Sequence, residues 1–305
     1  MSVSLEKIKK IEKLIKKAKN ILILTHKAPD GDAISSSLAL YFYLRKKGKT
    51  PYLYLIQLPK FLSFLPFFEK ISSKPPKNDD FDLIFALDYA ETHRLALWEG
   101  FTLKEERLIT IDHHPIEKLI GKIKLADSTA SSTCEVLYFW FKKRKFKISS
   151  KLATLLLCGI YTDSVAFSRL STSKRKIIGE LILKGGEIER ISKAYSSIAL
   201  SRAKLLATMI KRIKEIKPYG IIYSWLSKED FKKEKEKIFL QDPPVFPDFL
   251  SQIGEAKIYV LLIQQGREKV KVSLRGQDPR IDLSKIAEEF GGGGHPLASG
   301  FKTEG

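Results

Sequence analysis

The sequence predicts an α/β protein whose N-terminal part is a doubly wound, mainly parallel sheet, and two observations lead to this prediction. Short apolar runs at 21–25, 81–87 and 107–111 alternate with longer stretches whose apolar residues recur at helical spacing. The runs are nearly continuous, as expected of parallel strands that are buried on both faces. Strands and helices that alternate in this way form an open sheet with helices packed against it.

Each of these apolar runs ends in charged or polar side chains, at the edge where open α/β sheets bind their ligands. The chain holds only five histidines, and two of them are adjacent at the end of the third run, which argues against a plain surface turn there. The residues at the strand ends are His26, Asp30, Asp32, Asp88, Asp112, His113 and His114, and Asp163 follows an apolar helix.

The length of 305 residues is sufficient for two domains. We expect the first domain over 1–187 and a helical linker over 188–216, where an amphipathic stretch has no glycine or proline. A smaller α/β domain with a mixed sheet should follow over 217–305. Its expected strands are 221–225, 256–263 and 269–274, with a helix at 282–290.

Composition limits the compartment and the partners. The formal net charge of +19 favours anionic partners such as nucleotides or nucleic acid, although lysine-rich helix surfaces alone could produce it. The two cysteines, Cys134 and Cys158, lie in apolar helical patterns, so we expect reduced core residues rather than disulfides or a thiolate zinc site. No apolar run is long enough for a membrane span, and we expect a cytoplasmic protein without a membrane partner.

The strand-end carboxylates need a counter-charge. Four aspartates at one sheet edge would repel one another strongly, and a pair of divalent cations would compensate them. Carboxylate and imidazole ligands without thiolate suit Mn²⁺ or a similar ion. Two such ions form a clamp for in-line attack of an activated water on phosphorus, which predicts a metal-dependent phosphoester hydrolase.

A second group of candidate residues would bind the substrate. Gly291, Gly292, Gly293 and Gly294 follow a predicted helix, and the absence of side chains would allow backbone N–H groups to approach an anion. A flexible loop is the alternative interpretation of this run. His295, Arg275 at the end of a strand, and Arg94 shortly after Asp88 would add positive charge for a phosphate.

The order and spacing of these motifs resemble the DHH phosphoesterases. The resemblance rests on His26-x-x-x-Asp30-x-Asp32, the strand-ending Asp88, Asp112-His113-His114 and Thr162-Asp163. The segment from Gly291 to His295, followed by Ala298-Ser299-Gly300, is similar to the C-terminal domain associated with that family. The similarity covers nearly the whole chain. Its compact two-domain layout is most similar to the branch of nanoRNases and phosphatases of 3'-phosphoadenosine 5'-phosphate (pAp).

The resemblance implies a role for each candidate. His26, Asp30 and Asp88 would hold one Mn²⁺, and Asp32, Asp88, His113 and Asp163 the other, with Mg²⁺ or Co²⁺ as possible substitutes. His114 would contact the scissile phosphate, while Asp112 would orient a histidine from behind. Arg275, His295 and the glycine run would grip the nucleotide, with the active site in a cleft between the domains.

The predicted activity is the hydrolysis of short oligoribonucleotides (nanoRNA) to mononucleotides, with pAp, which would yield AMP, as a second candidate substrate. The alternatives are hydrolysis of cyclic or linear dinucleotides, a RecJ-like single-strand exonuclease, and a nucleic-acid-binding protein without activity. An intact set of ligands argues against the last. A homodimer is a further possibility, which the sequence leaves open.

Overall fold

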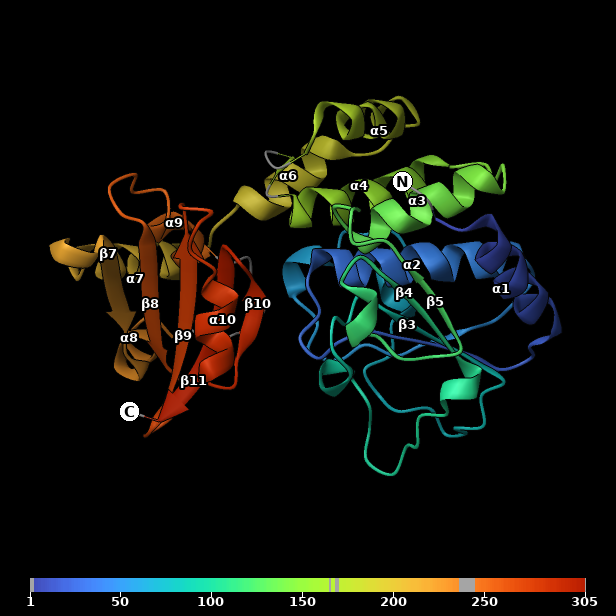
Figure 1. Ribbon diagram of the computed structural model, residues 1–305, viewed down its shortest axis with the longest axis horizontal. Coiled ribbons are helices and arrows are strands. Elements are labelled where there is room, and N and C mark those ends of the chain that lie inside the picture. Colours follow the sequence, from blue (N-terminus) through green and yellow to red (C-terminus); the bar gives the residue numbers. More distant parts are fainter. Residues whose placement is uncertain (1–2, 165, 168–169, 236–244, 305) are drawn as a thin grey trace. The chain divides into compact units, whose positions relative to one another are not determined.

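The structure is a computed structural model that describes residues 3–164, 166–167, 170–235 and 245–304. The chain divides into two compact units, Met1–Ser196 and Ser197–Gly305, which are described separately (Figure 1). Instead of one continuous connector over 188–216, the chain forms two helices, α6 (Ile188–Ser196) and α7 (Leu200–Lys211). Ile191 of α6 packs in the core of the first unit, whereas Leu205 and Met209 of α7 pack in the second.

The first unit is built on a five-stranded sheet in which every strand is parallel to its neighbours. The strand order is β2-β1-β3-β4-β5, so the direction of winding reverses between β1 and β3. This reversal is the point at which open α/β sheets bind ligands, beyond the carboxyl ends of the strands. The strands are β1 (Ile21–Leu24), β2 (Tyr52–Leu53), β3 (Leu83–Leu87), β4 (Leu108–Asp112) and β5 (Ile123–Ala126).

The two faces of this sheet are covered differently. Ile21 and Ile23 of β1 pack in the large core formed with the helices, while Leu22 and Leu24 pack against loops and short turns on the other face. The helices on the side of the first face are stacked in layers in Figure 1. They are α1 (Leu5–Lys17), α2 (Gly31–Lys46), α3 (Thr133–Lys143), α4 (Ser150–Asp163) and α5 (Thr172–Leu183).

The second unit contains a mixed six-stranded sheet of order β10-β11-β9-β8-β7-β6, as predicted. Only the pairing of β7 with β8 is parallel. The strands are β6 (Lys214–Ile216), β7 (Ile221–Leu226), β8 (Ile258–Gln264), β9 (Lys269–Gly276), β10 (Gly293–His295) and β11 (Ala298–Glu304), and the helices besides α7 are α8 (Lys228–Lys233), α9 (Val245–Leu250) and α10 (Leu283–Glu289).

The α/β prediction with a mainly parallel first sheet is therefore confirmed. Cys134 and Cys158 are buried and free in the core of the first unit. Within the described ranges, no helix combines the length and the apolar character that a membrane crossing would need.

Candidate metal centre

The strand-end side chains of the first unit converge into three overlapping groups of potential ligands. In each group the ligand atoms lie within 4.8 Å of one another. Asp88 belongs to all three groups and thus lies at the centre of the cluster. The groups are His26, Asp30 and Asp88; Asp32, Asp88, His113 and Asp163; and Asp88, His113 and His114.

Asp88 reaches the cluster through an unusual backbone conformation. It follows β3 with a φ of 51°, in the left-handed region that costs a residue with a side chain some strain. Its amide donates to the carbonyl of Ile111, which ties the turn to the neighbouring strand β4 at 3.1 Å. Its Oδ1 lies 3.4 Å from Nε2 of His113 and accepts a hydrogen bond from the hydroxyl of Thr133 at 3.1 Å.

Asp32 is fully buried at the start of α2 and faces the first turn of α3. Its two carboxylate oxygens accept the backbone N–H groups of Thr133 at 2.6 Å and Cys134 at 3.0 Å. These N–H groups have no partner within α3, so Asp32 caps that helix from another part of the chain. Burial and the nearby carboxylates of Asp88 and Asp163 nevertheless raise the pKa of Asp32 well above its usual value.

His113 lies between two acids and partly compensates their charge. Its Nε2 is 3.1 Å from Oδ2 of Asp163, and only 9% of the side chain is exposed. Burial lowers the pKa of His113, but its hydrogen bonds to Asp163 and Asp88 outweigh burial and raise it well above the ordinary range. Burial raises the pKa of Asp163 to about 7, and His113 opposes this only in part. The cluster thus retains protons that a divalent cation would displace.

The first ligand group is oriented by local hydrogen bonds. Nδ1 of His26 lies 2.7 Å from the carbonyl of Lys27 and donates to it, which leaves Nε2 as the ring nitrogen for a cation. Asp30 caps α2, because its Oδ1 accepts the N–H groups of Asp32 and Ala33. One carboxylate oxygen of Asp30 is thereby engaged, and the exposed side chain has a second oxygen for a cation.

Asp112 is fully buried and holds the two histidines that follow it. Its Oδ1 accepts the backbone N–H groups of His113 and His114 at 2.8 and 2.9 Å and lies 2.7 Å from Nδ1 of His114. Its Oδ2 accepts the N–H groups of Tyr89 and Ala90. All these contacts suit a carboxylate that orients its neighbours and does not itself face a ligand.

Comparison with known proteins agrees with this geometry. Residues 20–160 match the model of the DHH family, N-terminal domain, and residues 220–305 match that of the DHHA1 domain. The chain belongs to the DHH family.

This DHH chain aligns with several proteins over most of its length. The bifunctional oligoribonuclease and PAP phosphatase NrnA of Thermus thermophilus is 28% identical over 98% of this chain and 89% of its own. The protein of the same name from Bacillus subtilis is 25% identical over 92% of this chain and 88% of its own. The crystal structure of an exopolyphosphatase-related protein from Bacteroides fragilis superposes with a TM-score of 0.86, at 26% identity over 98% and 92% of the two chains.

The site of this DHH protein contains residues that the sequence did not single out. Thr133 contacts both Asp88 and Asp32, although only a serine- and threonine-rich helix start was visible in the sequence. Gly159 of α4 is another, because a Cβ there would collide with Oδ1 of Asp32 and lie 2.7 Å from the Cβ of Cys134. A glycine inside an apolar helix was the signal that could have revealed this close approach.

A third contact fixes the start of α2. The hydroxyl of Tyr195 lies 2.8 Å from that of Thr162, and both would collide with a Cβ at Gly31. Tyr195 comes from α6, in the segment that the sequence assigned to a linker. The loop between His26 and Asp32 is therefore held from the far end of the first unit's chain.

The two arginines that we predict to contact a phosphate have different surroundings. Arg94 is exposed in a short turn, Thr92–Arg94, and its carbonyl accepts the N–H of Lys27 at 2.8 Å, next to His26. Arg275 lies in the second unit, where its Nε donates to Oδ1 of Asp248 at 2.8 Å. Arg275 is thus positioned by an ion pair, and its role toward a substrate stays a prediction.

The glycine run is not the flexible loop of the alternative interpretation, and backbone conformation or close packing explains three of its four glycines. Gly291 ends α10 with a φ of 69°, and Gly293–His295 forms strand β10 against β11. A Cβ at Gly292 would lie 2.5 Å from the Cβ of Phe301, and one at Gly294 would lie 2.6 Å from the carbonyl of Ala298. Gly293 has neither a positive φ nor a neighbour within 4 Å of an added Cβ, so no packing reason accounts for it. These packing contacts concern the missing side chains, so anion binding by the backbone of the four glycines and by the exposed His295 stays a prediction.

Proposed function

We propose that this protein is a manganese-dependent phosphoesterase that hydrolyses short oligoribonucleotides to mononucleotides and converts pAp to AMP. Membership of the DHH family identifies the chain as a hydrolytic enzyme of the nuclease and phosphatase kind. The substrates proposed here are those in the names of the relatives from Thermus thermophilus and Bacillus subtilis. The net charge of +19 suits an anionic substrate of this kind.

The observation that carries the proposal is that Asp88 is shared by all three ligand groups. A carboxylate common to two sets of ligands can bridge a pair of cations, as two-metal phosphoesterases require. We assign one cation to His26, Asp30 and Asp88. The other would be held by Asp32, Asp88, His113 and Asp163. Oxygen and imidazole donors without thiolate suit Mn²⁺ or a similar ion.

When bound, the cations would supply the positive charge and Lewis acidity that activate water and neutralise the phosphate. The protein's own residues supply orientation and a proton. Asp112 holds a hydrogen on Nδ1 of His114, so a protonated His114 would present its other N–H to the phosphate or to the leaving oxygen. Thr133 fixes Oδ1 of Asp88 by donating its hydroxyl hydrogen to it. In the second unit, Arg275, the glycine run 291–294 and His295 would bind the nucleotide.

A substrate panel tests the proposal. Wild-type protein with Mn²⁺ should hydrolyse RNA of two to five units and pAp, in preference to cyclic di-AMP and long single-stranded DNA. Asp88→Asn should abolish hydrolysis of all of them, while Asp79→Asn, at an exposed aspartate outside the cluster, should not change it. Turnover confined to cyclic dinucleotides or to long DNA would reject the substrate assignment, and full activity of Asp88→Asn would reject the metal centre.

A further inference from the structure

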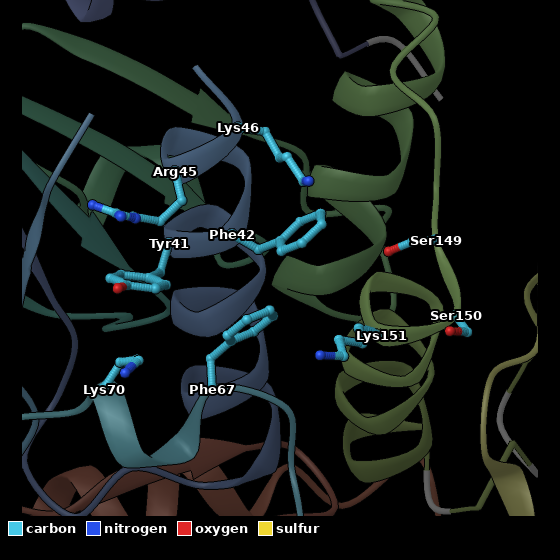
Figure 2. A pocket seen from close by; sticks show the side chains of 9 residues that line it. All are labelled: Tyr41, Phe42, Arg45, Lys46, Phe67, Lys70, Ser149, Ser150 and Lys151. Atoms are coloured by element: carbon cyan, nitrogen blue, oxygen red, sulfur yellow. The ribbon is translucent and has the colours of Figure 1, made fainter. Parts of the chain in front are cut away.

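A hollow of about 690 Å³ lies in the first unit (Figure 2), and none of its lining residues belongs to the metal centre. It is lined by the C-terminal half of α2, by the first turn of α4 and by the segment that contains Phe67 and Lys70. Asp32 is at the start of α2, and Lys46 follows it by fourteen residues, which corresponds to roughly 20 Å along the helix axis. The helix α4 runs between the same two places, since it begins in the hollow and ends at Asp163.

The hollow is strongly positive. Arg45, Lys46, Lys70 and Lys151 line it, and none of its lining residues is acidic. Lys46 and Lys151 form no ion pair with any carboxylate in the part of the chain that the structure describes. Lys70 has Glu69 at 3.7 Å, and Arg45 donates to the hydroxyl of Thr50. The uncompensated charge favours an anionic ligand.

Aromatic rings form the floor between these cations. The ring centroids of Phe42 and Phe67 are 5.4 Å apart, and Figure 2 shows both rings between α2 and α4. The amino group of Lys46 lies 5.6 Å from the centre of the Phe42 ring, and that of Lys151 lies 5.4 Å from the centre of the Phe67 ring. Rings combined with lysines can stack a base and bind its phosphate in one place.

Two further features fit such a ligand. Phe67 is held at a φ of 67°, a left-handed conformation that is costly for a bulky residue and is often found at ligand sites. At the start of α4 the hydroxyl of Ser149 accepts the N–H of Leu152, while the N–H groups of Ser150 and Lys151 have no carbonyl partner within the helix and add to the positive potential. The volume lies within the range of sites for small molecules.

We propose that this hollow is a second ligand site that binds a nucleoside monophosphate. The base packs against Phe67, which is partly exposed above the buried Phe42, and the phosphate binds Lys46 and Lys151 near the start of α4. The proposal does not depend on the hydrolysis proposed above, because it concerns binding in the absence of metal at a place that shares no residue with the metal centre.

Binding of AMP to the metal-free full chain, measured by titration calorimetry in EDTA, tests the proposal. The double variant Lys46→Glu/Lys151→Glu should bind AMP at least about tenfold more weakly, through loss of charge-assisted contacts. A charge-matched control, Lys104→Glu/Lys176→Glu, changes exposed lysines outside the hollow and should bind AMP like the wild type. Equal affinity in the two double variants, or no binding of AMP at all, would overturn the proposal.

Photo-crosslinking locates the ligand independently of any mutation. 8-Azido-AMP should label peptides that contain Phe42 or Phe67, and unlabelled AMP should compete. Phe67→Leu should weaken the binding of AMP and adenosine while inorganic phosphate binds as before. Labelling confined to peptides with Arg275 or His295 would overturn the proposal, as would competition by short RNA but not by AMP. Melting temperatures of all variants check that each is folded.

Discussion

Oδ1 of Asp112 lies 2.7 Å from Nδ1 of His114, and the same oxygen accepts the backbone N–H group of His114. The contact fixes both the ring and the peptide of this histidine. It also places the hydrogen on Nδ1, so that the opposite ring nitrogen is the one that can act on a substrate. A substitution of Asp112 therefore tests whether His114 acts on the substrate.

Asp112→Asn should lower kcat by about 10- to 100-fold, the usual effect of losing a partner that orients a site residue. The asparagine amide lacks the negative charge with which the Asp112 carboxylate would stabilise a positive charge on His114. Substrate contacts elsewhere are unchanged. We therefore expect little change in KM for a dinucleotide. Steady-state kinetics with Mn²⁺ measure this, and His93→Asn serves as control because His93 is exposed and lies beside Glu91. An unaltered kcat would exclude this role of Asp112.

Gly159→Ala should damage the metal centre without removing any ligand. The added Cβ would collide with Oδ1 of Asp32 and with Cys134, so either the helices separate or Asp32 moves. Overpacking of this kind typically costs about 1–3 kcal/mol of unfolding free energy. Denaturant unfolding and Mn²⁺ titration should both show a loss.

Gly179→Ala is the matched control for that substitution. Gly179 is an exposed helical glycine in α5, and a Cβ added there would meet no heavy atom within 4 Å. Alanine should stabilise the protein by up to about 1 kcal/mol because it restricts the unfolded chain. Equal stabilities of the two variants would contradict the close approach of α4 to Asp32.

Binding of Mn²⁺ should become tighter as the pH rises from 6 to 8. Below about pH 7 the carboxyl of Asp163 holds a proton, and the raised pKa of His113 keeps that ring protonated as well. A cation must displace these protons, so binding should release them. Calorimetry in two buffers of different ionisation enthalpy measures the release. An affinity that is the same at pH 6 and 8 would contradict the protonation described here.

The pKa shifts of Asp163 and His113 also determine whether the metal-free protein becomes more or less stable as the pH rises. The folded-state pKa values of Asp163 and His113 lie above their ordinary values, so their contribution to folding is complete at low pH and is lost as the pH rises through the folded values. Asp163→Asn should reduce the loss of melting temperature between pH 6 and 8. Mn²⁺ should protect the wild type more strongly at pH 8 than at pH 6.

The four glycines should respond differently to alanine. Gly292→Ala places a Cβ against β11 and should lower the melting temperature, whereas Gly293→Ala meets no neighbour and should leave it unchanged. If Gly293 contacts an anionic substrate, Gly293→Ala raises KM for a dinucleotide without altering the fold. A Gly292→Ala protein as stable as the wild type would contradict the close approach of this segment to β11.

The strand ends could be predicted because a buried parallel strand is a continuous apolar run and its polar terminus stands out. This placed His26, Asp88 and Asp112 correctly at one sheet edge. The cap that Asp32 provides for α3 could not be predicted, since it joins positions a hundred residues apart and depends on helix packing. The strand β5 could not be predicted from a continuous apolar run because Lys124 interrupts it.

The break between α6 and α7 and the pairing of the glycine run were missed for a similar reason. Residues 197–199 contain neither glycine nor proline, so the helical pattern continues across them in the sequence although each helix packs on its own unit. Four consecutive glycines carry no side-chain pattern at all. Their pairing follows from β11, which supplies the backbone that they approach.

The spread of the ligands along the chain has a consequence for synthesis. The second ligand group combines Asp32, Asp88, His113 and Asp163, so more than half of the polypeptide must be made before the group is complete. A chain growing from its N-terminus can hold a cation with all four ligands only after α4 has left the ribosome and packed beside α2. Capture of the cation would then report that the first unit has finished folding, and shorter nascent chains would bind it poorly.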